Sequence, residues 1–170
     1  SNLSCLASYK KLRDTIAVNS LTTVKNYLGY FEDVYLFFPV NLFDYSLKRQ
    51  MYNPSKIYCV DHALAAAMAF KFSADTGRIL ENIVFSELKM RGCEVYYWKD
   101  KNGKEVDFLI RQGQEITAAL QVCQDIDTSE TRKREISGAL AAAAAIGLSE
   151  AKILTTDREG EEIHKGVRIL

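Results

Sequence analysis

The sequence lacks several features that mark common classes of protein. Its 22 lysines and arginines are balanced by 22 aspartates and glutamates, so it has no basic excess of the kind that proteins bound to phosphate backbones usually carry. Any nucleic-acid-binding surface must therefore be local. No apolar run approaches the roughly 18–20 residues that span a bilayer, and we expect no membrane partner.

Histidine and closely spaced cysteine are also scarce. The two histidines, His62 and His164, and the four cysteines without a C-x-x-C pair do not suit a zinc site or a catalytic dyad. We expect the cysteines to be reduced thiols in a cytoplasmic protein. No serine or cysteine nucleophile comes with a recognisable base. Because there is no glycine-rich phosphate loop either, any ATP hydrolysis would be carried out outside these 170 residues.

The first part of the chain combines helix and strand signals. The predicted elements are helices over 4–16 and 21–33 and strands over 34–45 and 57–60, with a polar loop between the strands. Ser20 is suited to cap the second helix, and Pro39 indicates an edge or a break of its strand. Helix, turn, helix and a two-stranded hairpin are the layout of a winged helix, so we expect a winged-helix-like module.

The second part has a different and more regular order. Residues 62–72 favour a helix by propensity, and the turn-like stretch 73–77 divides the chain into modules over 1–73 and 74–170. The second module is predicted to contain helices over 76–91 and 129–146 and strands over 94–98, 105–111, 116–123, 152–155 and 166–170. Asn102-Gly103 is a strong hairpin-turn signal between its first two strands. The fold class is therefore α/β, an α+β arrangement with a mixed sheet.

Four short segments carry a family resemblance through their order and spacing. They are Thr23-Val24 with Tyr27-Leu28, Lys56–Asp61, Gly77–Asn82 and Gly103–Phe108. With the predicted element order, residues 78–126 resemble the PD-(D/E)XK nuclease superfamily. The whole chain resembles the C-terminal region of archaeal and bacterial AAA-type P-loop ATPases, catalogued as domain of unknown function 4143. The resemblance implies a restriction-endonuclease-like core, preceded by the winged-helix-like part expected from the element order, and an N-terminal ATPase module of the same parent chain.

The start of the sequence fits this interpretation. Ser1-Asn2 looks like an expression scar, without the charged and apolar regions of a signal peptide. We therefore expect the chain to be a fragment of a longer protein.

The nuclease resemblance implies a metal-dependent site. Such enzymes hold Mg²⁺ or Mn²⁺ with carboxylates and carry a lysine two residues beyond the acid of the third strand. The resemblance assigns Glu81 as the helix acid and Asp107 as the second-strand acid, and these two would be the metal ligands. The third strand has Gln121 and Cys123 in place of the acid and the lysine. Because a thiol cannot replace an ammonium, we predict a remnant site that has lost catalysis and a fragment without a cofactor.

Structural alternatives remain open for these acids. Glu81 is equally well explained as a solvated acid near a helix N-terminus, and Asp107 as the partner of an arginine such as Arg78. Basic residues at the start of the last helix, Arg132, Lys133 and Arg134, could compensate for the missing lysine. For Glu81 and Asp107, the sequence therefore does not decide between a remnant nuclease site and a structural role.

Candidate nucleic-acid contacts fall at three places. They are Thr22, Thr23, Lys25 and Asn26 on the predicted recognition helix, Lys48 and Arg49 in the loop between the two predicted strands, and Arg132 and Lys133 on the last helix. The second half of the recognition helix carries Glu32 and Asp33, which repel phosphate. A protein-contact role for this module is therefore as well supported as DNA binding.

Three functions follow from these observations. We favour a non-catalytic, degenerate nuclease-fold accessory domain of a P-loop ATPase that recognises nucleic acid, such as DNA, or a partner. The first alternative is an active Mg²⁺- or Mn²⁺-dependent DNA endonuclease. The second is a protein-interaction or oligomerisation module, and the sequence favours no particular oligomeric state.

Overall fold

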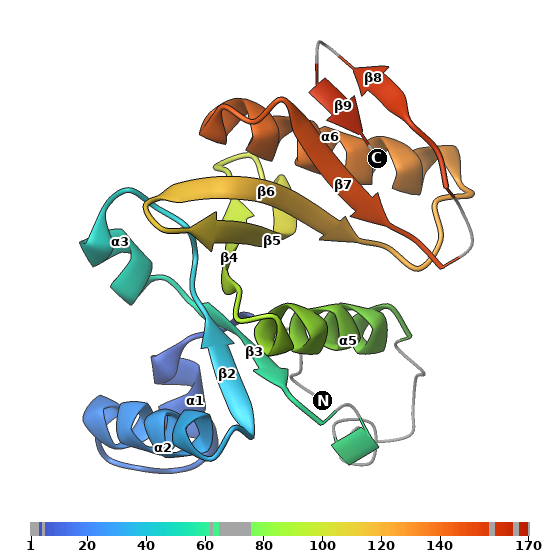
Figure 1. Ribbon diagram of the computed structural model, residues 1–170. Coiled ribbons are helices and arrows are strands. Elements are labelled where there is room, and N and C mark those ends of the chain that lie inside the picture. Colours follow the sequence, from blue (N-terminus) through green and yellow to red (C-terminus); the bar gives the residue numbers. More distant parts are fainter. Residues whose placement is uncertain are drawn as a thin grey trace. The chain divides into compact units, whose positions relative to one another are not determined.

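The computed structural model (Figure 1) describes residue 4 and residues 6–61, 63–64, 76–156, 159–164 and 167–169. The chain divides into two compact units, Ser1–Glu87 and Leu88–Leu170. The predicted mixed α/β fold class is confirmed, because helices accompany a three-stranded and a six-stranded sheet. Most of the helix predicted over 62–72, and the predicted module boundary after residue 73, lie outside the described residues.

The first unit is built on a three-stranded antiparallel sheet. Its elements are β1 (Leu6–Ala7), α1 (Tyr9–Thr15), α2 (Leu21–Asp33), β2 (Phe37–Val40), α3 (Leu47–Tyr52), β3 (Ser55–Cys59) and most of α5 (Thr76–Met90). Ser8, Ser20 and Ser46 each accept a backbone N–H at the start of α1, α2 and α3. These caps satisfy donors that have no partner inside a helix, which explains where the three helices begin.

Three predicted elements of this unit differ from the structure. Residues 6–7 form β1 rather than the start of a helix, because Leu6 pairs with Lys56 of β3. The predicted loop contains α3, a short helix that is capped by Ser46 and was not predicted. The predicted strand over 34–45 is confined to β2. Tyr35 has a φ of 57° and cannot belong to an extended chain, so the strand begins after it.

The core of the first unit joins β3 to α5. The strand order is β1-β3-β2, so Pro39 lies in an edge strand, as predicted. The ring of Tyr58 stacks on that of Phe85 at 4.5 Å between centroids. The buried amide of Asn82 accepts the backbone N–H of Cys59 and donates to its carbonyl oxygen. These contacts fix α5 against β3 both by apolar burial and by paired hydrogen bonds.

The second unit is a six-stranded mixed sheet with one long helix. Its elements are the end of α5, β4 (Glu94–Lys99), β5 (Glu105–Gln112), β6 (Glu115–Val122), α6 (Ser129–Ile146), β7 (Glu150–Leu154), β8 (Glu162–His164) and β9 (Val167–Ile169). The strand order is β4-β5-β6-β7-β9-β8, antiparallel from β4 to β6 and parallel where β6 meets β7 and β7 meets β9. The predicted elements match these closely, except that β8 was not predicted.

Helix α6 connects the parallel pair β6 and β7 and lies along one face of the sheet (Figure 1). Thr128 caps its start, and Gly147 ends it in the left-handed conformation at φ 86°. Small residues such as Gly138, Ala139 and Ala142 are buried on its inner face, which permits close packing on the sheet. Among the residues that the structure describes, no helix combines the length and hydropathy needed to cross a membrane.

Candidate functional site

Glu81, the predicted helix acid, lies on α5 within the first unit. Its carboxylate oxygen Oε1 accepts from Lys56 Nζ at 3.2 Å and from Tyr58 Oη at 2.6 Å. The Lys56 side chain is only 4% exposed and that of Glu81 is 13% exposed. A buried ammonium is tolerated when a carboxylate and hydrogen bonds compensate it. Glu81 therefore supplies the counter-charge of Lys56 in the core of the first unit.

Asp107 and Gln121 are brought together in the second unit. The backbone N–H of Asp107 donates to Gln121 Oε1 at 3.1 Å, and the backbone N–H of Val122 donates to Asp107 Oδ2 at 3.0 Å. Both residues are buried. Next to the paired residues Phe108 and Leu120, the hydrogen bonds between β5 and β6 are therefore made by side chains to backbone N–H groups.

Cys123 follows β6 directly. Its backbone N–H donates to the carbonyl oxygen of Leu154, and its Sγ lies 3.0 Å from the carbonyl oxygen of Asp125. Burial raises the pKa of the Cys123 thiol; the hydrogen bond with Asp125 and the charge of Arg134 lower it, and the charge of Glu135 raises it further. The net increase keeps the thiol protonated at neutral pH. The position that the resemblance assigns to a lysine therefore holds a neutral hydrogen-bond donor.

The predicted Mg²⁺ or Mn²⁺ can be tested against these donors. Mg²⁺ takes oxygen ligands, chiefly carboxylates, phosphates and water. In the second unit, one oxygen of Asp107 and the amide oxygen of Gln121 each accept a backbone N–H, and Cys123 offers sulfur. Within the described ranges, no group of three or more His, Cys, Asp or Glu is arranged to hold a metal ion. This donor set does not fit the divalent cation that the resemblance implies.

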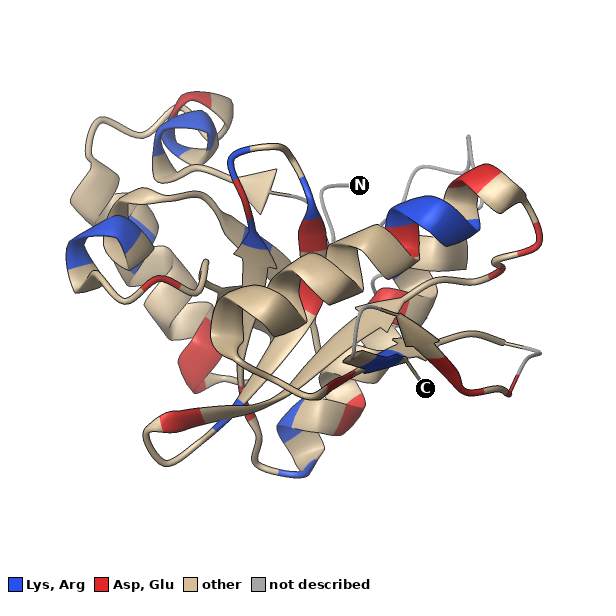
Figure 2. Ribbon diagram, turned by 90° about the horizontal axis from the view of Figure 1, so that it is seen from above, with Lys and Arg blue, Asp and Glu red and all other residues tan. Residues whose placement is uncertain are grey.

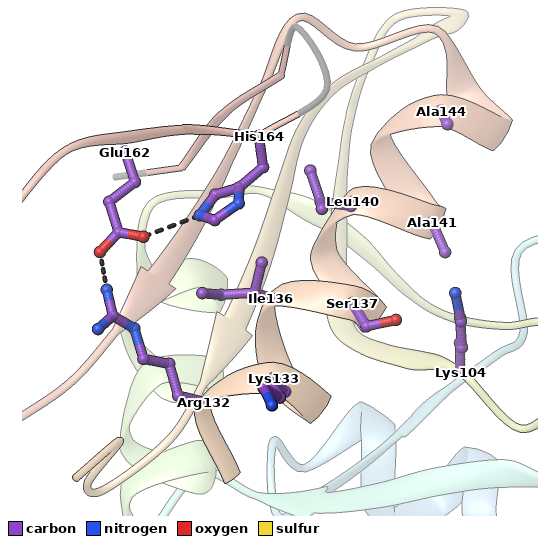
Figure 3. A pocket seen from close by; sticks show the side chains of 10 residues that line it. All are labelled: Lys104, Arg132, Lys133, Ile136, Ser137, Leu140, Ala141, Ala144, Glu162 and His164. Carbon is purple, nitrogen blue, oxygen red and sulfur yellow. Dashed lines mark hydrogen bonds and ion pairs between the residues drawn. The ribbon is translucent and has the colours of Figure 1, made fainter. Parts of the chain in front are cut away.

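A cavity of about 680 Å³ lies against α6 in the second unit (Figure 3). We name it the α6 cavity, and the residues that line it are Lys104, Arg132, Lys133, Ile136, Ser137, Leu140, Ala141, Ala144, Glu162 and His164. Three of these side chains are cationic, one is a carboxylate and one is an imidazole. The aliphatic side chains come from a single face of α6. The cavity therefore combines a basic lining with an apolar floor.

Glu162 joins two of the basic groups in the α6 cavity. It forms an ion pair with Arg132, and its Oε2 lies 2.8 Å from His164 Nε2, as Figure 3 shows. The three side chains are between 37% and 41% exposed. Glu162 and His164 are two residues apart on β8, so strand alternation turns both to the same face.

Only part of this cavity was predicted from the sequence. Arg132 and Lys133 were predicted as nucleic-acid contacts and both line it. Arg134, suggested as a substitute cation, instead pairs with Glu135 at 2.6 Å. Lys104, Glu162 and His164 were missed as site residues. Their spacing of two residues would have placed Glu162 and His164 on one face of a strand, but β8 was not predicted as a strand.

The predicted contacts of the first unit lie on α2 and α3. Thr22, Lys25 and Asn26 are exposed at the start of α2, whereas Thr23 is half-buried. Lys25 Nζ lies 5.3 Å from the centre of the Tyr9 ring. On α3, Lys48 and Arg49 are exposed, and Arg49 pairs with Asp44 at 3.2 Å. Figure 2 shows acidic and basic residues interspersed along the ribbon.

Comparison with known families matches both parts of the chain. A family described as domain of unknown function (DUF4143) matches residues 76–169, and one described as domain of unknown function (DUF8612) matches residues 1–75. The resemblance to domain of unknown function 4143, predicted for the whole chain, is confirmed for residues 76–169, whereas residues 1–75 match a different family. Its wider links to AAA-type ATPases and to PD-(D/E)XK nucleases stay predictions.

Two curated relatives share sequence with the chain. An uncharacterized protein of Methanocaldococcus jannaschii is 39% identical over 146 residues, which cover 82% of this chain and 31% of that protein. An uncharacterized protein of Haemophilus influenzae is 31% identical over 119 residues, 68% of this chain and 30% of that protein. The chain therefore spans less than a third of the length of either relative. No solved structure matches it.

Proposed function

The chain belongs to the DUF4143 family, and from this premise we propose that it is a non-catalytic accessory domain that recognises nucleic acid for an attached P-loop ATPase. In this proposal the second unit has a degenerate PD-(D/E)XK fold. The observation that carries it is the neutral thiol of Cys123, which donates toward the Asp125 carbonyl where a nuclease needs an ammonium. Positioned charge is usually the largest catalytic contribution, so its loss removes the basis for cleavage.

The arrangement of elements supports the fold part of this proposal. Helix α5, strands β4 to β6, helix α6 and strand β7 follow one another in the order that led to the nuclease resemblance. In the first unit, α1 and α2 are followed by β2 and β3, which pair as an antiparallel hairpin. Helix, turn, helix and hairpin are consistent with a winged-helix-like module, with β1 and α3 as additions.

Exposed basic and polar side chains support the recognition part. Lys25 and Asn26 project from the first half of α2, and Lys48 lies on α3. In the second unit, Arg132 and Lys133 line a cavity with a third cation, Lys104. Lysine and arginine contacts to phosphates supply most of the affinity in sequence-independent binding.

Cleavage can be tested with the wild-type chain, supercoiled plasmid and Mn²⁺. We expect no metal-dependent nicking. The control variant is Asp107→Asn, which keeps an oxygen that can accept the Val122 N–H while removing the charge. Nicking by the wild type that disappears in Asp107→Asn would contradict the proposal and point to an active endonuclease.

Binding can be tested by fluorescence anisotropy with duplex DNA at several salt concentrations. We expect affinity to fall steeply with salt, and each of Lys25→Gln and Lys48→Gln to reduce the log–log slope by about 0.9 if its lysine contacts a phosphate. Lys10→Gln, at an exposed position of α1, serves as the matched control. Salt-independent DNA binding, or no DNA binding, would contradict the proposed recognition of nucleic acid.

A second candidate function, an oligomerisation module, is favoured by one observation. Tyr27, Tyr30 and Val34 are 46%, 61% and 69% exposed and follow helical spacing along α2 and just past its end. A contiguous apolar stripe of this kind is typical of an interface. Sedimentation equilibrium would detect a dimer that Tyr30→Ser dissociates. A monomer at all concentrations would exclude this candidate.

A further inference from the structure

The charges of the α6 cavity are unequally distributed. Lys104, Arg132 and Lys133 contribute three cations, and Glu162 is the one carboxylate in the lining. In the view of Figure 3, Lys104 and Ser137 lie on the opposite side of the cavity from Glu162. The Arg132–Glu162 pair is about two-fifths exposed, and such pairs contribute little stability, so a ligand can compete for Arg132 at small cost.

The floor of the α6 cavity is apolar. Ile136, Leu140, Ala141 and Ala144 repeat at helical spacing along one face of α6 and line the cavity between the polar groups. A ligand that consisted only of an anion would leave this surface exposed. The floor therefore favours a ligand with a flat or apolar body attached to its anionic group.

We propose that the α6 cavity binds a single nucleotide unit. Its phosphate is held by Lys104 and Lys133 with the Ser137 hydroxyl, and its base lies on the aliphatic floor. Glu162 and His164 then face the base or ribose, whose amino and hydroxyl groups donate to a carboxylate. A cavity of about 680 Å³ falls in the range of roughly 300–1,000 Å³ that is usual for small-molecule sites. This inference deepens the proposed recognition of nucleic acid and rests on it.

The first test uses AMP, adenosine and inorganic phosphate as probes in isothermal titration calorimetry with the full 170-residue chain. We expect AMP to bind about tenfold or more tightly than adenosine or inorganic phosphate, because only AMP engages both ends of the cavity. AMP that binds no more tightly than inorganic phosphate would overturn the proposal.

Substitutions of lining residues test whether AMP binds in the α6 cavity. Lys104→Gln and Lys133→Gln should each weaken AMP binding about tenfold, since each removes a charge-assisted contact to phosphate. Both lysines are exposed, so the fold should tolerate the changes. Lys101→Gln, three residues from Lys104 on the same hairpin, is the matched control and should bind AMP as the wild type does. Unchanged AMP affinity in Lys104→Gln and Lys133→Gln would contradict the assignment.

The same phosphate can come from a free nucleotide or from the end of a strand. A 5′-phosphorylated oligonucleotide that binds tighter than its unphosphorylated twin, with the difference lost in Lys133→Gln, would identify a strand end. Equal binding of the two oligonucleotides, together with AMP binding, would identify a free nucleotide. Duplex binding without AMP binding would refute this inference and leave the proposed function standing. AMP binding without any binding of nucleic acid would support this inference and refute the proposed recognition of nucleic acid.

Discussion

The side-chain carbonyl of Gln121 accepts the backbone N–H of Asp107 at 3.1 Å across the β5–β6 pair. The Asp107 carboxylate in turn accepts the N–H of Val122, the residue after Gln121. Two residues that resemble a catalytic pair thus hold two buried strands together. A buried backbone N–H without an acceptor lowers the stability of the fold, so both side chains have a structural role here.

Gln121→Ala should lower the free energy of unfolding by about 1–3 kcal/mol, because it leaves the buried Asp107 N–H without this acceptor. Urea unfolding followed by circular dichroism would measure the change. Gln112→Ala is a matched control, since Gln112 is exposed on β5, and should change stability by less than about 0.5 kcal/mol. Equal effects of the two substitutions would contradict the structural role of Gln121.

Glu81→Gln should be strongly destabilising. It removes the carboxylate that faces the buried Lys56 ammonium, and breaking a buried pair from one side costs about 3–5 kcal/mol. Adding Lys56→Met in the same chain should restore part of the loss, because the buried charge is then gone. The free energies of unfolding of the two single variants and the double variant form a double-mutant cycle.

The surface pair formed by Glu94 and Arg111 provides the comparison for Glu81. Its side chains are 48% and 37% exposed, so Glu94→Gln should cost less than about 1 kcal/mol. If Glu81→Gln proved as mild as Glu94→Gln, Glu81 would not act as the counter-charge of Lys56. A role in a site would then become the better explanation.

Two helical glycines should respond to alanine with opposite signs. A Cβ at Gly138 of α6 would lie 2.5 Å from the backbone oxygen of Glu105, so Gly138→Ala should destabilise by about 1–3 kcal/mol. A Cβ at Gly29 of α2 meets nothing within 4 Å, and Gly29→Ala should stabilise by about 0.5–1 kcal/mol. Thermal unfolding of both variants checks the pair. A neutral Gly138→Ala would argue against the close approach of α6 to β5.

Cys123 should react slowly with iodoacetamide in the native chain. Its pKa is raised above the ordinary value of 9.0, so less of the reactive thiolate is present at pH 8 than in the unfolded chain. The stability linked to the protonated thiol is complete below pH 9.0 and is lost as pH rises through the raised pKa. Alkylation rates of the Cys123 peptide, measured by mass spectrometry with and without urea from pH 8 to above 9, test this. Equal rates at pH 8 would contradict the raised pKa.

The sequence by itself determined the elements with strong local signals. Helix α2 begins and ends where its Ser20 cap and apolar spacing predict, and α6 occupies the predicted residues 129–146. The Asn102-Gly103 turn correctly joined β4 to β5. These signals act over a few residues, through backbone caps, turn geometry and periodic burial, so they can be read without knowledge of the fold.

Only the tertiary structure decided what the candidate residues touch. Strands β1 and β8 exist through pairing with β3 and β9, and their two or three residues carry too little local preference to be predicted. Glu81 accepts hydrogen bonds from Lys56 and Tyr58, which lie more than 20 residues earlier in the sequence. Glu162 of β8 forms an ion pair with Arg132 of α6. Such contacts depend on which surfaces are buried together. The sequence can therefore nominate charged residues, but the packing of strands and helices decides whether each one serves the core or a cavity.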